Sequence, residues 1–145
     1  MMQTNAIDKD VMIQQWQTCV DMANSISQRR DTMNNLLVTL NLAIVATVTI
    51  VWDLKSLLIS FVGIVICCVW WRFITYFKHL NKAKFSVISE LEQSMQIKPF
   101  TKEWEILCKD KKFVEGTKLE RIFPVAFGIV YITVIVLMIC MKMEG

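Results

Sequence analysis

The sequence contains few residues that interrupt helices. Only four of its 145 residues are glycine and two are proline. Neither type occurs from Met1 to Val62, and neither occurs between Gly63 and Pro99. Because glycine and proline are the residues that most strongly disfavour a helix interior, we predict long, uninterrupted helices in both stretches.

The residue combinations that carry out catalysis are also missing. The chain has one histidine, His79, and its five cysteines include no C-x-x-C pair. It has no paired carboxylates, nucleophile–base pair, H-E-x-x-H motif or glycine-rich phosphate loop. His79 follows Lys78 at the end of an apolar run, where an interfacial polar residue is a commoner explanation than a proton relay. We therefore expect no enzyme activity, no catalytic residue, no cofactor and no bound metal.

What the chain has in excess is apolar residues in long runs. Hydrophobic residues make up 54% of the sequence, and the mean hydropathy is +0.44. Leu36–Trp52 and Leu57–Phe77 are apolar runs of 17 and 21 residues, and Ile122–Met141 is a third of 20. At about 1.5 Å per residue each matches the ~30 Å hydrocarbon core of a bilayer. We predict an all-α membrane protein with three transmembrane helices, the first two forming a hairpin (36–77). A soluble bundle is the alternative, but too few residues remain to surround both helices.

Outside the spans, two apolar stripes at helical spacing predict that the long helices continue beyond the bilayer. The first stripe, in residues 1–35, predicts an amphipathic helix that packs against another helix. The second extends the helix of the second span to about Met95. The stripes consist of Met12, Trp16, Cys19, Ala23 and Ile26, and of Leu80, Ala83, Val87, Leu91 and Met95. Ser56 is a candidate N-cap for the second span, and Thr101 for a short helix that follows Pro99.

Lysine and arginine are distributed unevenly around the spans. Three precede the first span, one lies between the first two, ten fall in residues 78–121, and one follows Met141. The positive-inside rule then places residues 1–35 and 78–121 in the cytoplasm, as a helical bundle, and residues 142–145 outside. Seven acidic residues offset the ten cations of 78–121, which disfavours a nucleic-acid partner.

Polar residues within the spans are the candidates for a lumen or for contacts between helices. They are Thr39, Asn41, Thr47 and Thr49. Ala43, Ala46 and Gly63 are candidates for close contact between protomers. Trp70, Trp71, Arg72 and Tyr76 are expected to form an interface belt where the second span leaves the bilayer. One chain is too small to enclose a pathway. Eight helices of about 10 Å diameter would form a ring with axes about 13 Å from its centre.

Four segments resemble a known family: Trp71–Phe77, Leu80–Phe85, Val87–Glu92 and Lys98–Trp104. They resemble the RipA-type family of small octameric membrane proteins, and the N-terminal half more distantly resembles the two-span SLATT-like effectors. The resemblance implies a homo-octameric ring, pore formation and a role in bacterial defence against phage at the inner membrane. Candidates for packing within the cytoplasmic ring, or only within one protomer, are Asn81, Lys84, Phe85, Glu92, Pro99, Phe100 and Trp104.

These observations lead to one principal hypothesis and two alternatives. We expect a homo-oligomeric effector whose cytoplasmic helices sense a phage-derived or host protein and whose spans let ions leak across the lipid bilayer. A non-conducting scaffold or adaptor for a cytoplasmic partner is the first alternative. A holin-like lysis protein is the second.

Overall fold

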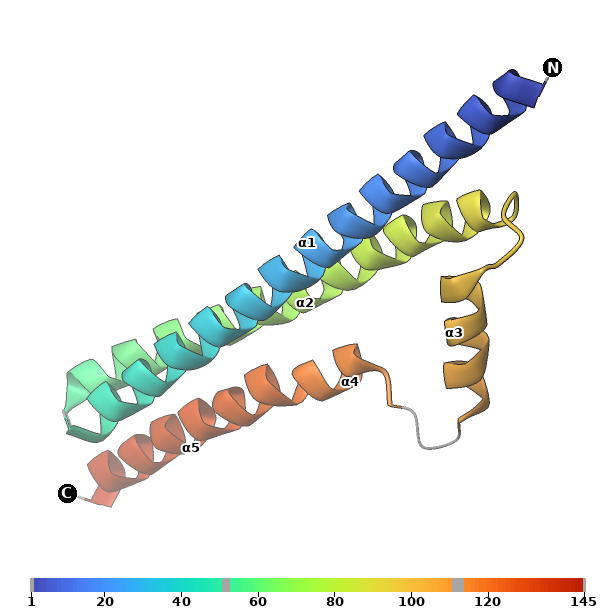
Figure 1. The fold of residues 1–145 in the computed structure, drawn as a ribbon. Helices are drawn as coiled ribbons and strands as arrows, with labels where there is room; N and C mark the ends of the chain where they lie inside the picture. The colour runs from blue at the N-terminus through green and yellow to red at the C-terminus, as the bar shows by residue number, and fades with distance from the viewer. Residues whose placement is uncertain (1, 51–52, 111–113, 145) are drawn as a thin grey trace. The chain divides into compact units, whose positions relative to one another are not determined.

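The described part of the chain forms five helices. The computed structural model describes residues 2–50, 53–110 and 114–144, and these contain no β-strand. Figure 1 shows the helices in chain order. They are α1 (Met2–Ile50), α2 (Leu54–Glu92), α3 (Pro99–Lys109), α4 (Gly116–Glu120) and α5 (Ile122–Glu144). The all-α fold predicted from the sequence is confirmed.

The helices α1 and α2 are long, as the scarcity of glycine and proline predicts. They contain 49 and 39 residues, which corresponds to about 74 and 58 Å at the usual rise per residue. α2 ends at Glu92 rather than near Met95. The amides of the next three residues bond to carbonyls only three residues back, at 3.0–3.3 Å, and this tighter turn ends the helix.

The start of α2 differs from the prediction. Asp53, not Ser56, occupies the N-cap position: its carboxylate accepts a hydrogen bond from the amide of Lys55 at 2.7 Å. The Ser56 hydroxyl accepts in return from the amide of Asp53 at 3.4 Å. This reciprocal arrangement follows the capping-box pattern. Residues 51 and 52, the predicted end of the first span, lie outside the described residues.

The residues group into two compact units. The spanning unit consists of Arg30–Tyr76 and Glu115–Gly145, and the polar unit consists of Met1–Arg29 and Phe77–Val114. α1 and α2 each contribute one part to both units.

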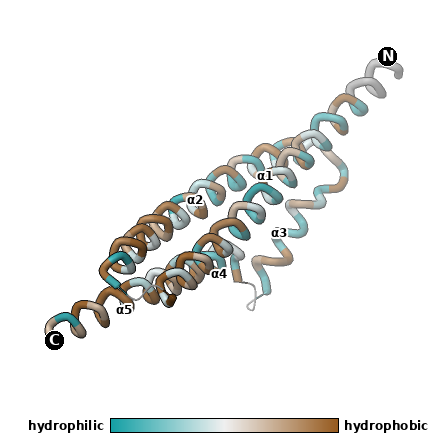
Figure 2. Tube along the Cα trace, turned by 90° about the vertical axis from the view of Figure 1, so that its left-hand side faces the viewer, coloured by the Kyte–Doolittle hydropathy of each residue, from teal (hydrophilic) through white to brown (hydrophobic). Residues whose placement is uncertain are grey.

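Three helical stretches of the described chain are long and apolar enough to cross a membrane: Lys9–Ile50, Leu54–Glu92 and Gly116–Met143. Figure 2 shows hydrophobic residues concentrated in α5, in the C-terminal half of α1 and in the N-terminal half of α2. The three predicted apolar runs fall within these helices. The protein is therefore an all-α membrane protein with three spans.

The core of the spanning unit is small. Leu37, Trp70 and Ile74 are buried together, and Val38, Ile66 and Phe127 pack against them. Large apolar side chains of α2 and α5 instead remain exposed, Phe61 and Ile132 among them. Such outward apolar side chains suit contact with lipid rather than with water.

In the polar unit, the first predicted stripe is the buried side of α1. Its residues are all buried or half-buried, with Ala23 and Ile26 the most enclosed. The second stripe is shifted from its predicted position, because Ala83 and Val87 are exposed while Ile88 is fully buried. The true inner face of α2 therefore lies about one residue further round the helix.

Candidate functional site

Asn41 lies where α1, α2 and α5 meet. Its side chain is 0% exposed, and its Nδ2 group donates a hydrogen bond to the carbonyl of Leu37 at 2.7 Å. Its Oδ1 accepts hydrogen bonds from the Tyr131 hydroxyl of α5 at 2.9 Å and from the Cys67 thiol of α2 at 3.5 Å. A buried amide costs little only when both ends are bonded, so these contacts accommodate Asn41 among apolar helices. We call Asn41, Cys67 and Tyr131 the polar node.

The ring of Tyr131 lies directly against Gly63 of α2. A Cβ atom at position 63 would lie 2.5, 2.6 and 2.8 Å from three ring atoms, whereas carbon atoms in normal contact are about 3.5–4.0 Å apart. The expectation that Gly63 lies between protomers is therefore corrected, because the close approach is inside one chain. Tyr131 was not predicted as a site residue. The signal available in the sequence was a tyrosine in the middle of the last apolar run.

The threonines predicted together with Asn41 lie elsewhere. Thr39, Thr47 and Thr49 are exposed, and each hydroxyl donates to a backbone carbonyl three or four residues earlier at 2.8–2.9 Å. The structure thus separates the four predicted residues. Asn41 joins helices of one chain, and the threonines lie on the surface of the protomer.

Of the four residues predicted for the interface belt, Trp70 points inward. It is 0% exposed, its indole N–H donates to the Asn34 side chain at 2.9 Å, and its ring stacks on Phe123 with centroids 6.2 Å apart. The other three are exposed: Trp71, Arg72 and Tyr76. Trp70 therefore acts as a core residue of the spanning unit that satisfies its polar N–H internally.

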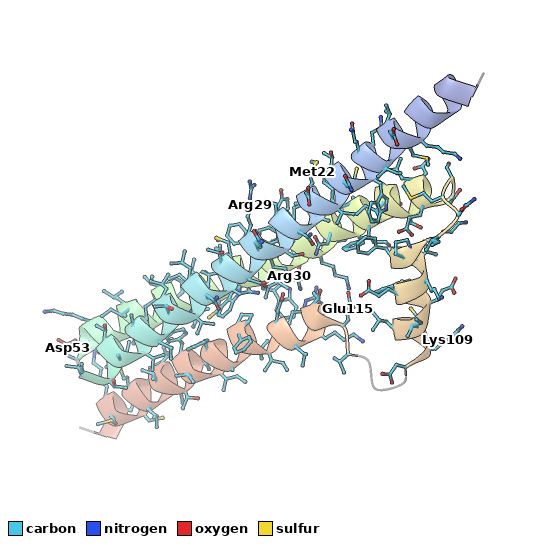
Figure 3. All side chains as sticks on the ribbon, in the orientation of Figure 1. Met22, Arg29, Arg30, Asp53, Lys109 and Glu115 are labelled. Atoms are coloured by element: carbon cyan, nitrogen blue, oxygen red, sulfur yellow. The ribbon has the colours of Figure 1, made fainter. Side chains whose placement is uncertain are left out.

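Arg30, labelled in Figure 3, makes an ion pair within the spanning unit. Its Nε donates to the Glu120 carboxylate at 2.8 Å, and its Nη2 donates to the Thr117 hydroxyl at 3.1 Å. The arginine and glutamate side chains are 14% and 21% exposed. This contact joins α1 to α4, and sequence reasoning missed it because 90 residues separate the partners.

In the polar unit, Glu92 at the end of α2 caps the start of α3. Its carboxylate is 0% exposed and accepts hydrogen bonds from the amides of Phe100 and Thr101, both at 3.0 Å, and from the Thr101 hydroxyl at 2.8 Å. The prediction of Thr101 as N-cap is wrong, since Lys98 holds that position and makes no side-chain cap bond. A carboxylate from another helix satisfies the free amides instead, and its charge complements the helix dipole.

Two opposing effects set the pKa of Glu92. Burial disfavours the charged form and would raise the pKa, but the hydrogen bonds from Phe100 and Thr101 outweigh burial. The pKa therefore lies below the ordinary value of 4.5. Glu92 is thus negatively charged at neutral pH.

Aromatic rings pack beside this cap. Phe100 lies between Trp16 of α1 and Phe85 of α2, with ring centroids 5.8 Å from each. Aromatic pairs at this separation add to the stabilisation that burial itself gives. The structure therefore brings Phe85, Glu92 and Phe100 together, and it adds Trp16 and Thr101, which the sequence did not assign to the site.

The other residues predicted to pack in the cytoplasmic ring are Asn81, Lys84, Pro99 and Trp104. Lys84 approaches the Met22 sulfur at 3.9 Å, and Asn81 is half-buried. Pro99 occupies the first turn of α3, where its missing N–H costs little. Trp104 is 57% exposed.

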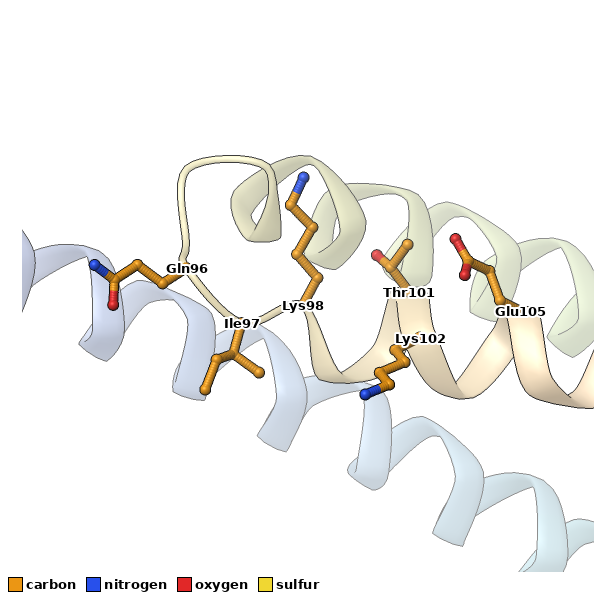
Figure 4. A pocket seen from close by; sticks show the side chains of 6 residues that line it. All are labelled: Gln96, Ile97, Lys98, Thr101, Lys102 and Glu105. Carbon is orange, nitrogen blue, oxygen red and sulfur yellow. The ribbon is translucent and has the colours of Figure 1, made fainter.

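An open hollow of about 450 Å³ lies at the connection between α2 and α3. Figure 4 shows its lining, in which the amines of Lys98 and Lys102 extend in opposite directions. The other lining residues are Gln96, Ile97, Thr101 and Glu105. Because the two cations do not converge, the hollow does not resemble an anion site.

Most of the chain is similar to one known protein family. A family model described as the octameric membrane protein family (8xMP) matches residues 13–140. No curated protein and no solved structure matches the chain.

Proposed function

We propose, since the chain belongs to the octameric membrane protein family, that eight copies assemble into a ring whose spans let ions leak across the membrane. The output would arrest or kill the cell, as expected of a bacterial anti-phage effector at the inner membrane. This role needs no catalytic residue, and the described residues include no cluster of His, Cys, Asp or Glu able to hold a metal ion.

The observation that carries the proposal is the chemistry of one exposed side of α1. Asn35, Thr39, Ala43, Ala46 and Thr47 are exposed and fall within about 120° of the helix circumference at 3.6 residues per turn. We call them the small polar face. Two large apolar side chains on the same arc, Leu36 and Ile50, are also exposed, but they lie near the two ends of the span and leave its middle small and polar. The Thr39 hydroxyl donates to its own helix at 2.9 Å, so its oxygen retains lone pairs that can accept from water.

The exposed sides of the other two spans have a different character. α2 exposes Leu58, Phe61 and Val65, and α5 exposes Ile129 and Ile132. Large apolar side chains suit lipid, whereas small and polar ones suit a neighbouring helix or water. This contrast favours an assembly with α1 toward the central axis and with α2 and α5 toward the bilayer.

The size of such an assembly is compatible with ion passage. Eight helices of about 10 Å diameter in a ring place their axes about 13 Å from the centre and leave a lumen about 8 Å in radius. The buried Asn41 would stabilise each protomer rather than line the lumen. The small polar face would supply the wetted surface.

The polar unit is the proposed receiver of the trigger. Its α3 is attached through Glu92 and through the rings packed on Phe100, with no fully buried residue of its own. A protein that competes for Phe100 would release α3 without disturbing the spans.

The proposed topology places the residues before the first span, and those between the second and third spans, in the cytoplasm. The C-terminus would lie outside.

Leakage from liposomes that contain the purified octamer tests the proposal. The wild-type protein should release a small ion, and the double variant T39V/T47V should release it several-fold more slowly, because an apolar lining favours dewetting of the lumen. T133V is the matched control: Thr133 on α5 is also exposed and its hydroxyl also donates to its own helix, at 2.8 Å. An octamer that never leaks, even when F100A removes the ring contacts that hold α3, or one slowed equally by T133V, contradicts the proposal.

A non-conducting adaptor is the second candidate, and exposed apolar residues of α3 favour it. Trp104 and Ile106 are 57% and 61% exposed, which suits the docking of a partner protein. The adaptor predicts an octamer that captures a partner through α3 and releases no ions with or without it.

A further inference from the structure

A two-part groove lies on the spanning unit where α4 meets α5 and approaches α2. It is open and has a volume of about 370 Å³. Its polar end is formed by cations and an aromatic ring, and its other end is apolar. The lining residues are Trp71, Lys118, Arg121, Ile122, Val125, Ala126 and Ile129.

Arg121 is held in place at the polar end but retains hydrogen-bonding capacity. Its guanidinium carbon lies 4.7 Å from the centre of the Trp71 ring, and its Nη2 makes a long hydrogen bond of 3.4 Å to the Thr75 hydroxyl. Its Nε is buried without a hydrogen-bond partner among the described residues. Stacking on an aromatic face orients an arginine and leaves its in-plane donors available for an anion.

The nearby charges leave this end positive. Lys118 is exposed and lies one helical turn before Arg121. The carboxylate of Glu120 is bound by Arg30 from α1, so it is already neutralised. Glu115, the other acid of this segment, is half-buried. A monovalent anion bound at this end would therefore contact two cations, Lys118 and Arg121. The Glu120 carboxylate would not repel it strongly, because that charge is already paired with Arg30.

The apolar end extends into the predicted third span. From Arg121 to Ile129 is eight residues, or about 12 Å along the helix, which fits within the ~15 Å half-thickness of a bilayer core. Trp71 is 39% exposed and belongs to the predicted interface belt. The cations thus lie at headgroup level and the apolar residues at acyl-chain level.

We propose that this groove binds an anionic phospholipid of the phosphatidylglycerol type. The phosphate contacts Arg121 and Lys118, and one acyl chain lies along Ile122, Val125 and Ile129. Basic pockets between membrane helices commonly hold anionic headgroups, and free phosphate would leave the apolar part of the groove unused. The site depends only on the protein being in a membrane and not on whether it conducts ions.

Native mass spectrometry of the whole assembly, with added phosphatidylglycerol or phosphatidylcholine, tests the site. The wild-type assembly should retain phosphatidylglycerol in preference to phosphatidylcholine. The variant K118Q should weaken that preference roughly fivefold, the effect expected of one cation near an anionic headgroup, and K118Q/R121Q roughly 25-fold. Arg72 is an exposed cation beside Trp71 that does not line the groove, so R72Q should leave the preference unchanged and serves as the matched control.

The single variant keeps the test decisive if the double variant fails to assemble, because Lys118 is exposed. Three results would overturn the proposal: equal retention of both lipids by the wild-type assembly, an equal loss in R72Q, or displacement of the lipid by inorganic phosphate at matched concentration. The last result would show a phosphate site rather than a lipid site. Occupation of the groove by a neighbouring chain would appear as equal retention of the two lipids.

Discussion

A methyl group added at Gly63 should destabilise the protein, because the space it would occupy is filled by Tyr131. The nearest ring atom lies 2.5 Å from the position of the new Cβ, so the ring must retreat by about 1 Å to reach normal contact. Overpacking of this kind costs about 1–3 kcal/mol. Retreat also lengthens the 2.9 Å hydrogen bond to Asn41, which adds about 0.6 kcal/mol in a membrane interior.

The helix itself prefers alanine to glycine by about 1 kcal/mol, so the net cost of G63A should be about 0.6–2.6 kcal/mol. Gly128 of α5 provides the control, because no atom lies within 4 Å of its would-be Cβ. G128A should leave stability unchanged or raise it by up to about 1 kcal/mol.

Replacing Tyr131 should reverse the sign of the change that G63A makes in the free energy of unfolding. In a Y131A background the obstructing ring is gone, and G63A should then stabilise the protein by up to about 1 kcal/mol through helix propensity alone. Unfolding of the detergent-solubilised protein, followed by helical circular dichroism, measures all four variants. If G63A costs the same with and without the Tyr131 ring, the proposed packing of α5 on α2 is refuted.

Three further predictions concern the polar node and the α3 cap. Y131F and N41L should each destabilise the protein by about 1 kcal/mol, with a coupling energy of about 0.6–1.7 kcal/mol in a double-mutant cycle, and a coupling of zero would contradict the direct hydrogen bond. E92Q should lower the hydrogen-exchange protection of the Phe100 and Thr101 amides by roughly tenfold, since capping bonds are worth about 1 kcal/mol and bonds to a charge more. Because the pKa of Glu92 is lowered in the folded protein, its contribution to stability is present above pH 4.5 and is lost as the pH falls through the folded pKa. Protection of these two amides should therefore fall below about pH 4.5 in the wild type and show no such step in E92Q.

The features that the sequence predicted are those carried by continuous patterns. Apolar runs long enough for a bilayer locate the three spans, and the absence of glycine and proline predicts that α1 and α2 continue past them. These signals are local and additive over many residues, so errors at single positions do not change the outcome.

The features that it did not predict depend on pairings between distant segments. Tyr131 meets Asn41 across 90 residues, and nothing near either residue indicates the other. The cap of α2 is a local exception: Asp53 and Ser56 are both cap-forming types only three residues apart, and the backbone path decides which one caps the helix. Glu92 is the last residue of α2 but its carboxylate caps α3. A search for a cap residue just before α3 therefore does not find it.

Cysteine labelling shows whether α1 lines a water-filled path. The ion current through a bilayer that contains the octamer is measured before and after labelling with a charged, membrane-impermeant thiol reagent. The protein would carry serine at its five cysteine positions and a single new cysteine, introduced by T39C on α1 or T133C on α5. Labelling should reduce the current of T39C and leave that of T133C unchanged. No current from either octamer, with or without F100A, or an equal reduction in both, would contradict a water-filled path lined by α1.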